Sequence, residues 1–214
     1  MSAPDGLRLG VAACALGAAL ALGVQVWRTR AYGLRPPQAA PAGSAWRGLL
    51  YAFGPGMSPA AKESTRAHPL VYALGVSYHL GIFTAAGVLV RVVTGAPVPS
   101  AAPQAGALVL LAAGTTGGAA LLVRRARSPR LRAFSVPDDY VSNFLTTAFV
   151  ALAGVALLVP GVAPVFLVAA MLLLAWTPLG KIRHCLFFFA ARGHLGRHYG
   201  RRGTFPPSLG GRAP

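Results

Sequence analysis

The sequence predicts an all-α integral membrane protein built as a bundle of five transmembrane helices. The 214 residues are 55% hydrophobic and only 11% charged, whereas about a quarter of the residues in a soluble domain are charged. Five apolar stretches also reach the length of about 20 residues that a helix needs to cross the hydrocarbon core. We therefore expect a single membrane domain over residues 1–204 and a flexible cytoplasmic tail over 205–214.

The five expected spans are separated by polar or turn-forming segments. The first resembles a signal peptide, but it has no clear cleavage site of small residues, and Arg28 and Arg30 follow it, so it is expected to be retained. The fourth and fifth are joined by a short Pro-Gly turn, typical of a link between antiparallel helices. The proline-rich loop over 28–67 is a candidate for a short interfacial helix. The spans cover approximately residues 7–27, 69–93, 105–123, 141–160 and 163–190.

The basic residues determine the expected orientation, because the cytoplasmic flanks of membrane helices collect Lys and Arg. The loops after the first and third spans and the tail are basic, whereas the other side carries only Arg8 and Arg91. We therefore expect the N-terminus outside and the C-terminus inside, in the cytoplasmic (inner) membrane of a bacterium or archaeon. This topology explains the formal charge of +16 without nucleic acid, because a nucleic-acid-binding protein spreads its cations over a solvated face.

The two cysteines and the motif content exclude several classes of function. Cys14 and Cys185 both lie in apolar stretches without CxxC or CxxCH spacing. A disulfide framework, an iron–sulfur site and covalent c-type haem attachment are therefore not supported. The sequence also shows no nucleophile–base set and no phosphate-binding glycine loop, so no catalytic residue is predicted.

Two histidines are expected inside the membrane, where ionisable residues are costly and are functional candidates. His79 lies ten residues after Pro69, about 15 Å into its helix, and His184 lies six residues before Ala190, about 9 Å in. One interpretation is structural: His79 bonds to a neighbouring carbonyl, and His184 is interfacial. In the other, the two neutral imidazoles bind the iron of one b-type haem from opposite faces.

The surroundings of the two histidines suit a haem. Small and apolar residues, among them Gly75 and Phe83, lie one turn either side of His79 and leave room for a flat macrocycle. Lys181 and Arg183 lie close to His184, where haem propionates would emerge toward the cytoplasmic surface. These two cations are therefore the candidate propionate contacts.

Each of the remaining polar residues has a structural interpretation as well as a functional one. Asp138 or Asp139 is expected to cap the fourth span, where a carboxylate complements the helix N-terminus. The alternative for this pair is a proton-handling site beside a quinone. The basic segment over 193–203 favours lipid headgroups or a docking partner. Solvation at the interface is the expected role of His68, His194 and His198, and the alternative is that His68 holds another cofactor together with His194 or His198.

Three segments resemble the gamma subunit of respiratory nitrate reductase, a five-span cytochrome b that carries electrons between quinol and a cytoplasmic iron–sulfur partner. Tyr78-His-Leu-Gly-Ile82 is similar to the aromatic-His-x-Gly-Ile motif of that family's second span. The arginine-rich stretch over 121–132 resembles the exit of its third span. Gly180-Lys-Ile-Arg-His184 resembles the ligand region of its fifth span.

The resemblance implies that His79 and His184 pair as ligands of the inner haem. The family's outer haem uses two further histidines, and the corresponding positions here are Leu89 and Phe166, which implies one haem in place of two. It also implies a quinone substrate and a cytoplasmic iron–sulfur or heterodisulfide-reductase-like partner subunit.

The expected function is therefore that of the membrane electron-transfer subunit of a quinone-linked oxidoreductase. Two alternatives stay open at this point. One is a membrane anchor without redox chemistry, which explains the basic loops but gives His79 no role. The other is a small transporter, which the absence of inverted repeats and of intramembrane carboxylates disfavours.

Overall fold

The computed structural model describes residues 5–33, 39–59 and 62–207, and these residues form helices and connections without a β-strand. Four helices among them are long and apolar enough to cross a membrane: α1 (Asp5–Thr29), α4 (Pro69–Thr94), α5 (Ala101–Arg127) and α7 (Pro137–Leu158). A fifth is reached if α8 (Ala163–Trp176) and α9 (His184–Arg201) are counted as one broken span. The prediction of an all-α protein with several membrane helices is confirmed, whereas its orientation stays a prediction.

The expected fifth span over 163–190 is not one continuous helix. The helix α8 ends at Trp176, and the N–H groups of Leu179 and Gly180 both donate to the Trp176 carbonyl, at 3.0 and 2.9 Å. Pro178 has no N–H to continue the ladder. A short 3₁₀ helix, η5 (Lys181–Arg183), follows, and α9 then extends to residue 201, eleven residues beyond the expected end.

The chain divides into two compact units, each described by itself. Unit 1 comprises Met1–Ala21 and Leu70–Ile182, and unit 2 comprises Leu22–Pro69 and Arg183–Pro214. The expectation of a single membrane domain over 1–204 stays a prediction. Residues 208–214 of the expected tail lie outside the described residues. The short elements are η1 (Arg30–Gly33), η2 (Pro55–Met57), α3 (Glu63–Ala67), α6 (Pro129–Ala133) and η4 (Pro160–Val162).

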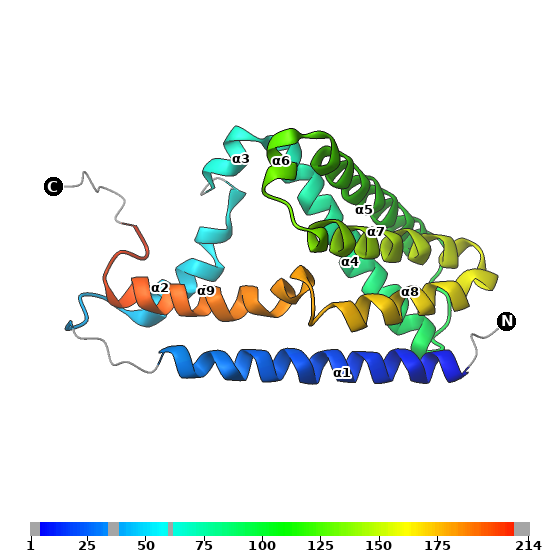
Figure 1. Cartoon of the computed structure of the whole chain (residues 1–214), viewed down its shortest axis with the longest axis horizontal. Helices are drawn as coiled ribbons and strands as arrows, with labels where there is room; N and C mark the ends of the chain where they lie inside the picture. Colours follow the sequence, from blue (N-terminus) through cyan, green and yellow to red (C-terminus); the bar gives the residue numbers. More distant parts are fainter. Residues whose placement is uncertain (1–4, 34–38, 60–61, 208–214) are drawn as a thin grey trace. The chain divides into compact units, whose positions relative to one another are not determined.

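In unit 1, α5 packs against α7, and α7 packs against α8 (Figure 1). Phe149 of α7 and Phe166 of α8 stack in its core with ring centroids 5.3 Å apart. Where α4 crosses α5, a Cβ on Gly81 would lie 2.7 Å from the Cα of Gly114. No side chain fits there, so glycine permits the close approach of the two backbones, as in other packed membrane helices.

In unit 2, the short helix expected in the loop over 28–67 is present as α2 (Ala45–Phe53), which packs on α9 (Figure 1). A Cβ on Gly48 would collide with the backbone of Gly196 and Gly200, so glycines set the spacing of this pair. The Arg192 guanidinium donates to the Ala52 carbonyl at 2.6 Å and to the Gly56 carbonyl at 2.8 Å. A cation thus satisfies carbonyls at the C-terminal end of α2, where the helix dipole favours positive charge.

Candidate functional site: a carboxylate cluster and a membrane histidine

Asp138, in the first turn of α7, joins three elements of unit 1. Its Oδ1 accepts hydrogen bonds from Ser142 Oγ at 2.6 Å and from Trp176 Nε1 at 3.1 Å. Its Oδ2 accepts the backbone N–H of Lys181 at 2.7 Å. This carboxylate therefore bonds to the end of α8 and to the start of η5, on either side of the break in the expected fifth span.

Asp139 forms ion pairs with two basic side chains and caps its own helix. Its Oδ2 accepts the N–H of Val136 at 2.9 Å and the Lys181 amine at 2.7 Å, and its Oδ1 lies 3.3 Å from Arg125 Nη1. Only 9% of the Asp139 side chain is exposed, and the paired cations offset the cost of removing this charge from water. The capping interpretation is confirmed for Asp139, while the proton-handling interpretation stays a prediction.

Gly180 completes the cluster because no other residue fits there. A Cβ at this position would lie 2.6 Å from Asp138 Oδ1 and 2.9 Å from Ser142 Oγ, and it would also collide with Trp176 Nε1. The break after α8 and the carboxylate cluster are therefore one structural feature. The polar groups around Asp138 and Asp139 all donate to the two carboxylates, and this arrangement favours the ionised form of both.

His79 lies on an exposed face of α4, with its Nδ1 2.7 Å from the Gly75 carbonyl oxygen. A carbonyl oxygen can only accept a hydrogen bond, so the hydrogen of this contact is on Nδ1. In a neutral imidazole the other nitrogen, Nε2, then has a lone pair that can bind a metal ion or accept a hydrogen bond. A Cβ on Gly75 would meet nothing within 4 Å, and Phe83 one turn away is 70% exposed. The hydrogen bond to Gly75 is the one expected from the structural interpretation of His79, and that expectation is confirmed. The tautomer that this bond sets and the open apolar face also fit a haem ligand.

The turn of α4 that carries His79 is fixed by its buried neighbour Tyr78. The Tyr78 hydroxyl donates to the Asn143 carbonyl at 3.0 Å and accepts from Thr147 Oγ1 at 3.0 Å, both on α7. This network anchors α4 to α7 beside the candidate ligand. The position of His79 along and around its helix is therefore set by packing within unit 1.

The structure brings some predicted site residues together and describes others separately. Asp138, Asp139 and Lys181 form one cluster in unit 1. His79 belongs to unit 1, whereas His184, the exposed first residue of α9, and exposed Arg183 belong to unit 2. Within the described ranges, no group of three or more His, Cys, Asp or Glu side chains is arranged to hold a metal ion.

The sequence did not identify four members of the cluster: Arg125, Ser142, Trp176 and Gly180. The spacing of Asp138 and Ser142, four residues apart on one helix face, was an available signal. Arg125 was used only as one of the basic residues that predict the orientation in the membrane. The positions of Trp176 and Gly180 depend on a contact between segments about forty residues apart in the chain, for which the sequence carries no local signal.

The likeness to the nitrate reductase gamma subunit depends on three short segments. Comparison with protein-family models, with curated proteins and with solved structures finds no match to this chain. The function is therefore argued from the residues themselves, and the family likeness stays a prediction.

Proposed function

We propose that this chain is a membrane cytochrome b subunit, which passes electrons between the quinone pool and a cytoplasmic iron–sulfur or heterodisulfide-reductase-like partner through one b-type haem. The observation that carries the proposal is His79 on a candidate membrane helix, with its Nδ1 hydrogen held by Gly75. A histidine is costly in such a helix, and metal-bound histidines commonly have their other ring nitrogen fixed in this way.

The packing around two apolar positions supports a single haem. Phe166 is fully buried and stacks on Phe149, and Leu89 packs against the same core. These are the positions where the similar family has its outer ligands, and neither side chain can bind iron. Of the two ligand positions on the second span of that family, only the inner one, His79, is a histidine here.

The proposed roles follow from where each residue lies. When bound, the haem supplies one-electron transfer between the quinone and the partner's clusters. His79 and His184 would hold the iron, and the Gly75 carbonyl sets the tautomer of His79. Lys181 and Arg183 would contact the propionates, and Asp138 fixes the backbone at Lys181.

The visible spectrum of the purified full-length protein tests the proposal. We expect a b-type pyridine haemochrome with about one haem per chain, because two axial imidazoles complete one iron site. Expression is carried out with ample haem supply so that the site can fill. A chain that carries no haem under these conditions would refute the assignment.

The proposal also places quinone chemistry beside Asp139 and Lys181. The Lys181 side chain is 53% exposed. An Asp139→Asn variant keeps an oxygen that can accept the Val136 N–H but loses the charge that pairs with Lys181. We expect a quinone analogue that shifts the haem spectrum of the wild type to bind the variant about tenfold more weakly, since a charge-assisted contact contributes about 1.5–3 kcal/mol. An exposed-site control is Asp5→Asn, and equal titrations for all three proteins would place the quinone elsewhere.

A second candidate function is a membrane anchor without redox chemistry. The hydrogen bonds to both oxygens of Asp138 favour this second candidate, because they stabilise the break after α8 without any cofactor. The haem measurement separates the two candidates, since an anchor is expected to purify without a haemochrome.

A further inference from the structure

Unit 1 has an open groove at the end where α4 leads into α5, which is the opposite end of α5 from its arginine-rich C-terminus. Its volume is about 430 Å³. Thr84, Gly87 and Arg91 lie on one face of α4 and form one wall, while Pro97, Gln104 and Leu157 contribute to the rest of the lining. From Thr84 to Arg91 the wall extends two helical turns, about 10 Å along the axis.

The groove is lined mostly by apolar residues, and its polar members besides Arg91 are Thr84 and Gln104. The Gln104 amide donates one hydrogen bond to the Leu157 carbonyl at 3.2 Å, and the Thr84 hydroxyl donates to the Leu80 carbonyl at 2.8 Å. Arg91 is the only cation among the described residues that line the groove. Its Nε is buried and has no hydrogen-bond partner in the described part of the chain.

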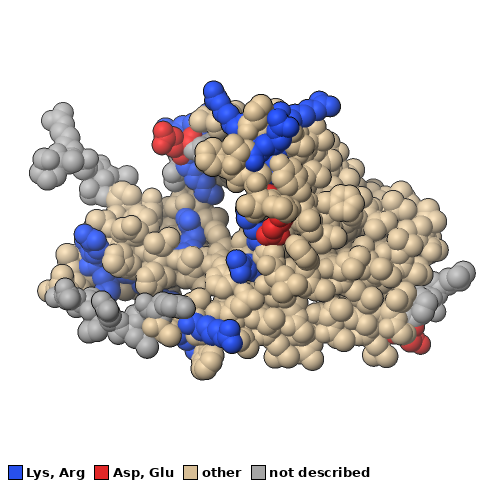
Figure 2. Space-filling model, in the orientation of Figure 1, with Lys and Arg blue, Asp and Glu red and all other residues tan. Residues whose placement is uncertain are grey.

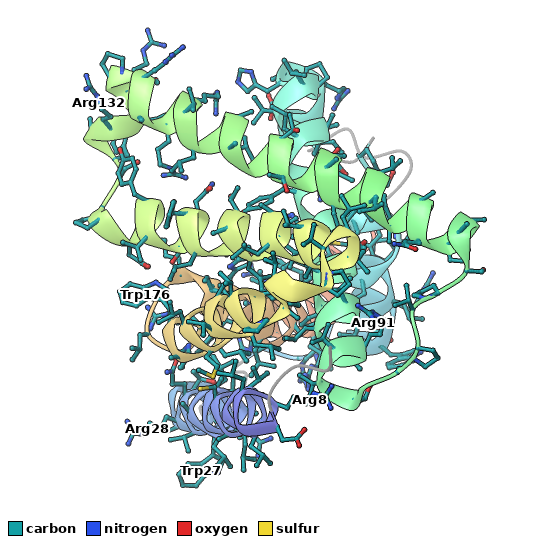
Figure 3. The ribbon with its side chains drawn as sticks, turned by 90° about the vertical axis from the view of Figure 1, so that its right-hand side faces the viewer. Arg8, Trp27, Arg28, Arg91, Arg132 and Trp176 are labelled. Carbon is teal, nitrogen blue, oxygen red and sulfur yellow. The ribbon has the colours of Figure 1, made fainter. Side chains whose placement is uncertain are left out.

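Arg8 adds a second positive charge close to this end. Its Nη1 would lie 3.5 Å from a Cβ built on Gly95, and the N–H of the next residue, Ala96, donates to the Arg91 carbonyl at 3.1 Å. Both arginines therefore flank the same turn, and Figure 3 shows them far from Arg132 within unit 1. Arg8 Nε is also buried without a partner among the described residues, and the Asp5 carboxylate that pairs with Arg8 at 3.7 Å is 92% exposed.

Besides the buried Nε, each guanidinium carries two Nη groups that can donate, and a phosphate oxygen is the acceptor that the planar geometry of a guanidinium suits. The apolar wall beside Arg91 suits a hydrocarbon chain, which a free phosphate lacks. We propose that this groove binds one anionic phospholipid, with its phosphate at Arg91 and Arg8 and an acyl chain along the α4 wall toward Thr84. The site is independent of the haem and of the proposed redox function.

Lipid retention by the detergent-solubilised full-length protein, measured by native mass spectrometry, tests this site. The probes are phosphatidylglycerol, phosphatidylcholine with the same acyl chains, and inorganic phosphate. We expect phosphatidylglycerol to bind about tenfold more tightly than phosphatidylcholine. Both lipids carry the phosphate, but the choline ammonium of phosphatidylcholine cancels the net charge and is repelled by the two arginines. Inorganic phosphate is expected to compete only weakly, because it cannot occupy the apolar wall.

Three variants separate the headgroup contact from the chain contact. Arg91→Gln is expected to abolish the preference for phosphatidylglycerol, and Arg91→Lys to keep part of it, because lysine retains the charge but not the bidentate geometry. Gly87→Leu places a side chain in the groove, where a Cβ meets nothing within 4 Å, and should weaken binding of both lipids. The matched control is Gly106→Leu on α5, which is equally unobstructed but does not line the groove.

Thermal unfolding of each variant identifies any that fails to fold. If an arginine variant is unstable, the lipid binding of Gly87→Leu tests the site instead. Equal retention of the two lipids, or unchanged lipid binding in both Arg91→Gln and Gly87→Leu, would overturn the site. Inorganic phosphate competing as tightly as the lipid would also overturn it, because the groove would then be a simple anion site.

Discussion

On the proposed function, a His79→Ala variant is expected to bind no b-type haem, with the haem content per chain falling at least about tenfold below that of the wild type. The reason is that alanine removes the axial nitrogen and the Nδ1–H contact that positions it 2.7 Å from the Gly75 oxygen. His184→Ala is expected to have the same effect, because each of the two proposed ligands would supply one bond to the iron. The measurement is the pyridine haemochrome at equal protein concentration.

Two controls separate ligand loss from unfolding. His68→Ala removes an exposed histidine just before α4 and should leave the haem content unchanged. Added imidazole should restore part of the low-spin spectrum in His79→Ala, because a free imidazole can replace the missing ligand in a folded site. Full haem content in both His79→Ala and His184→Ala would refute the ligand assignment.

Replacing Asp138 with alanine is expected to lower the free energy of unfolding by about 3 kcal/mol, since hydrogen bonds to charged groups contribute about 1.5–3 kcal/mol each and are not additive. The change leaves the donors of Ser142, Trp176 and Lys181 without their common acceptor. Thermal unfolding in one detergent measures the effect as a fall in the midpoint temperature.

The matched control is Asp5→Ala, whose carboxylate is 92% exposed and makes one pair at 3.7 Å. Its effect should stay within about 0.5 kcal/mol, as is usual for surface substitutions. Asp138→Asn should also destabilise the protein, because its amide nitrogen would face a donor whichever way the side chain turns. An unchanged midpoint for Asp138→Ala would show that the cluster does not stabilise the break after α8.

The sequence predicted the class of the protein because that information is local. Apolar stretches of about 20 residues can satisfy their backbone groups in lipid only as helices or closed barrels, and four of the expected spans are single helices in the structure. The fifth corresponds to two helices, α8 and α9, which count as one span only if the broken pair is taken together. Pro178 is a visible signal of a kink there, but the contacts that hold the break form only in the folded chain.

The candidate site was only partly predictable for a similar reason. Asp138, Asp139, Lys181 and His79 could be selected because charged and titratable residues are rare in this chain and costly beside lipid. Their contacts could not, because Lys181 lies about forty residues after Asp138 in the sequence. The proximity of Gly48 to Gly200 in unit 2 likewise depends on residues about 150 positions apart.

The sequence by itself therefore determined that this is an all-α chain with several membrane-crossing helices, and it singled out the residues whose chemistry is unusual in that setting. Only the tertiary structure decided that the carboxylates of Asp138 and Asp139 hold the turn after α8, and that Gly75 fixes the tautomer of His79. Hydrophobicity and segment length are additive along a chain, whereas a hydrogen bond exists only once packing has brought its donor and acceptor within about 3 Å.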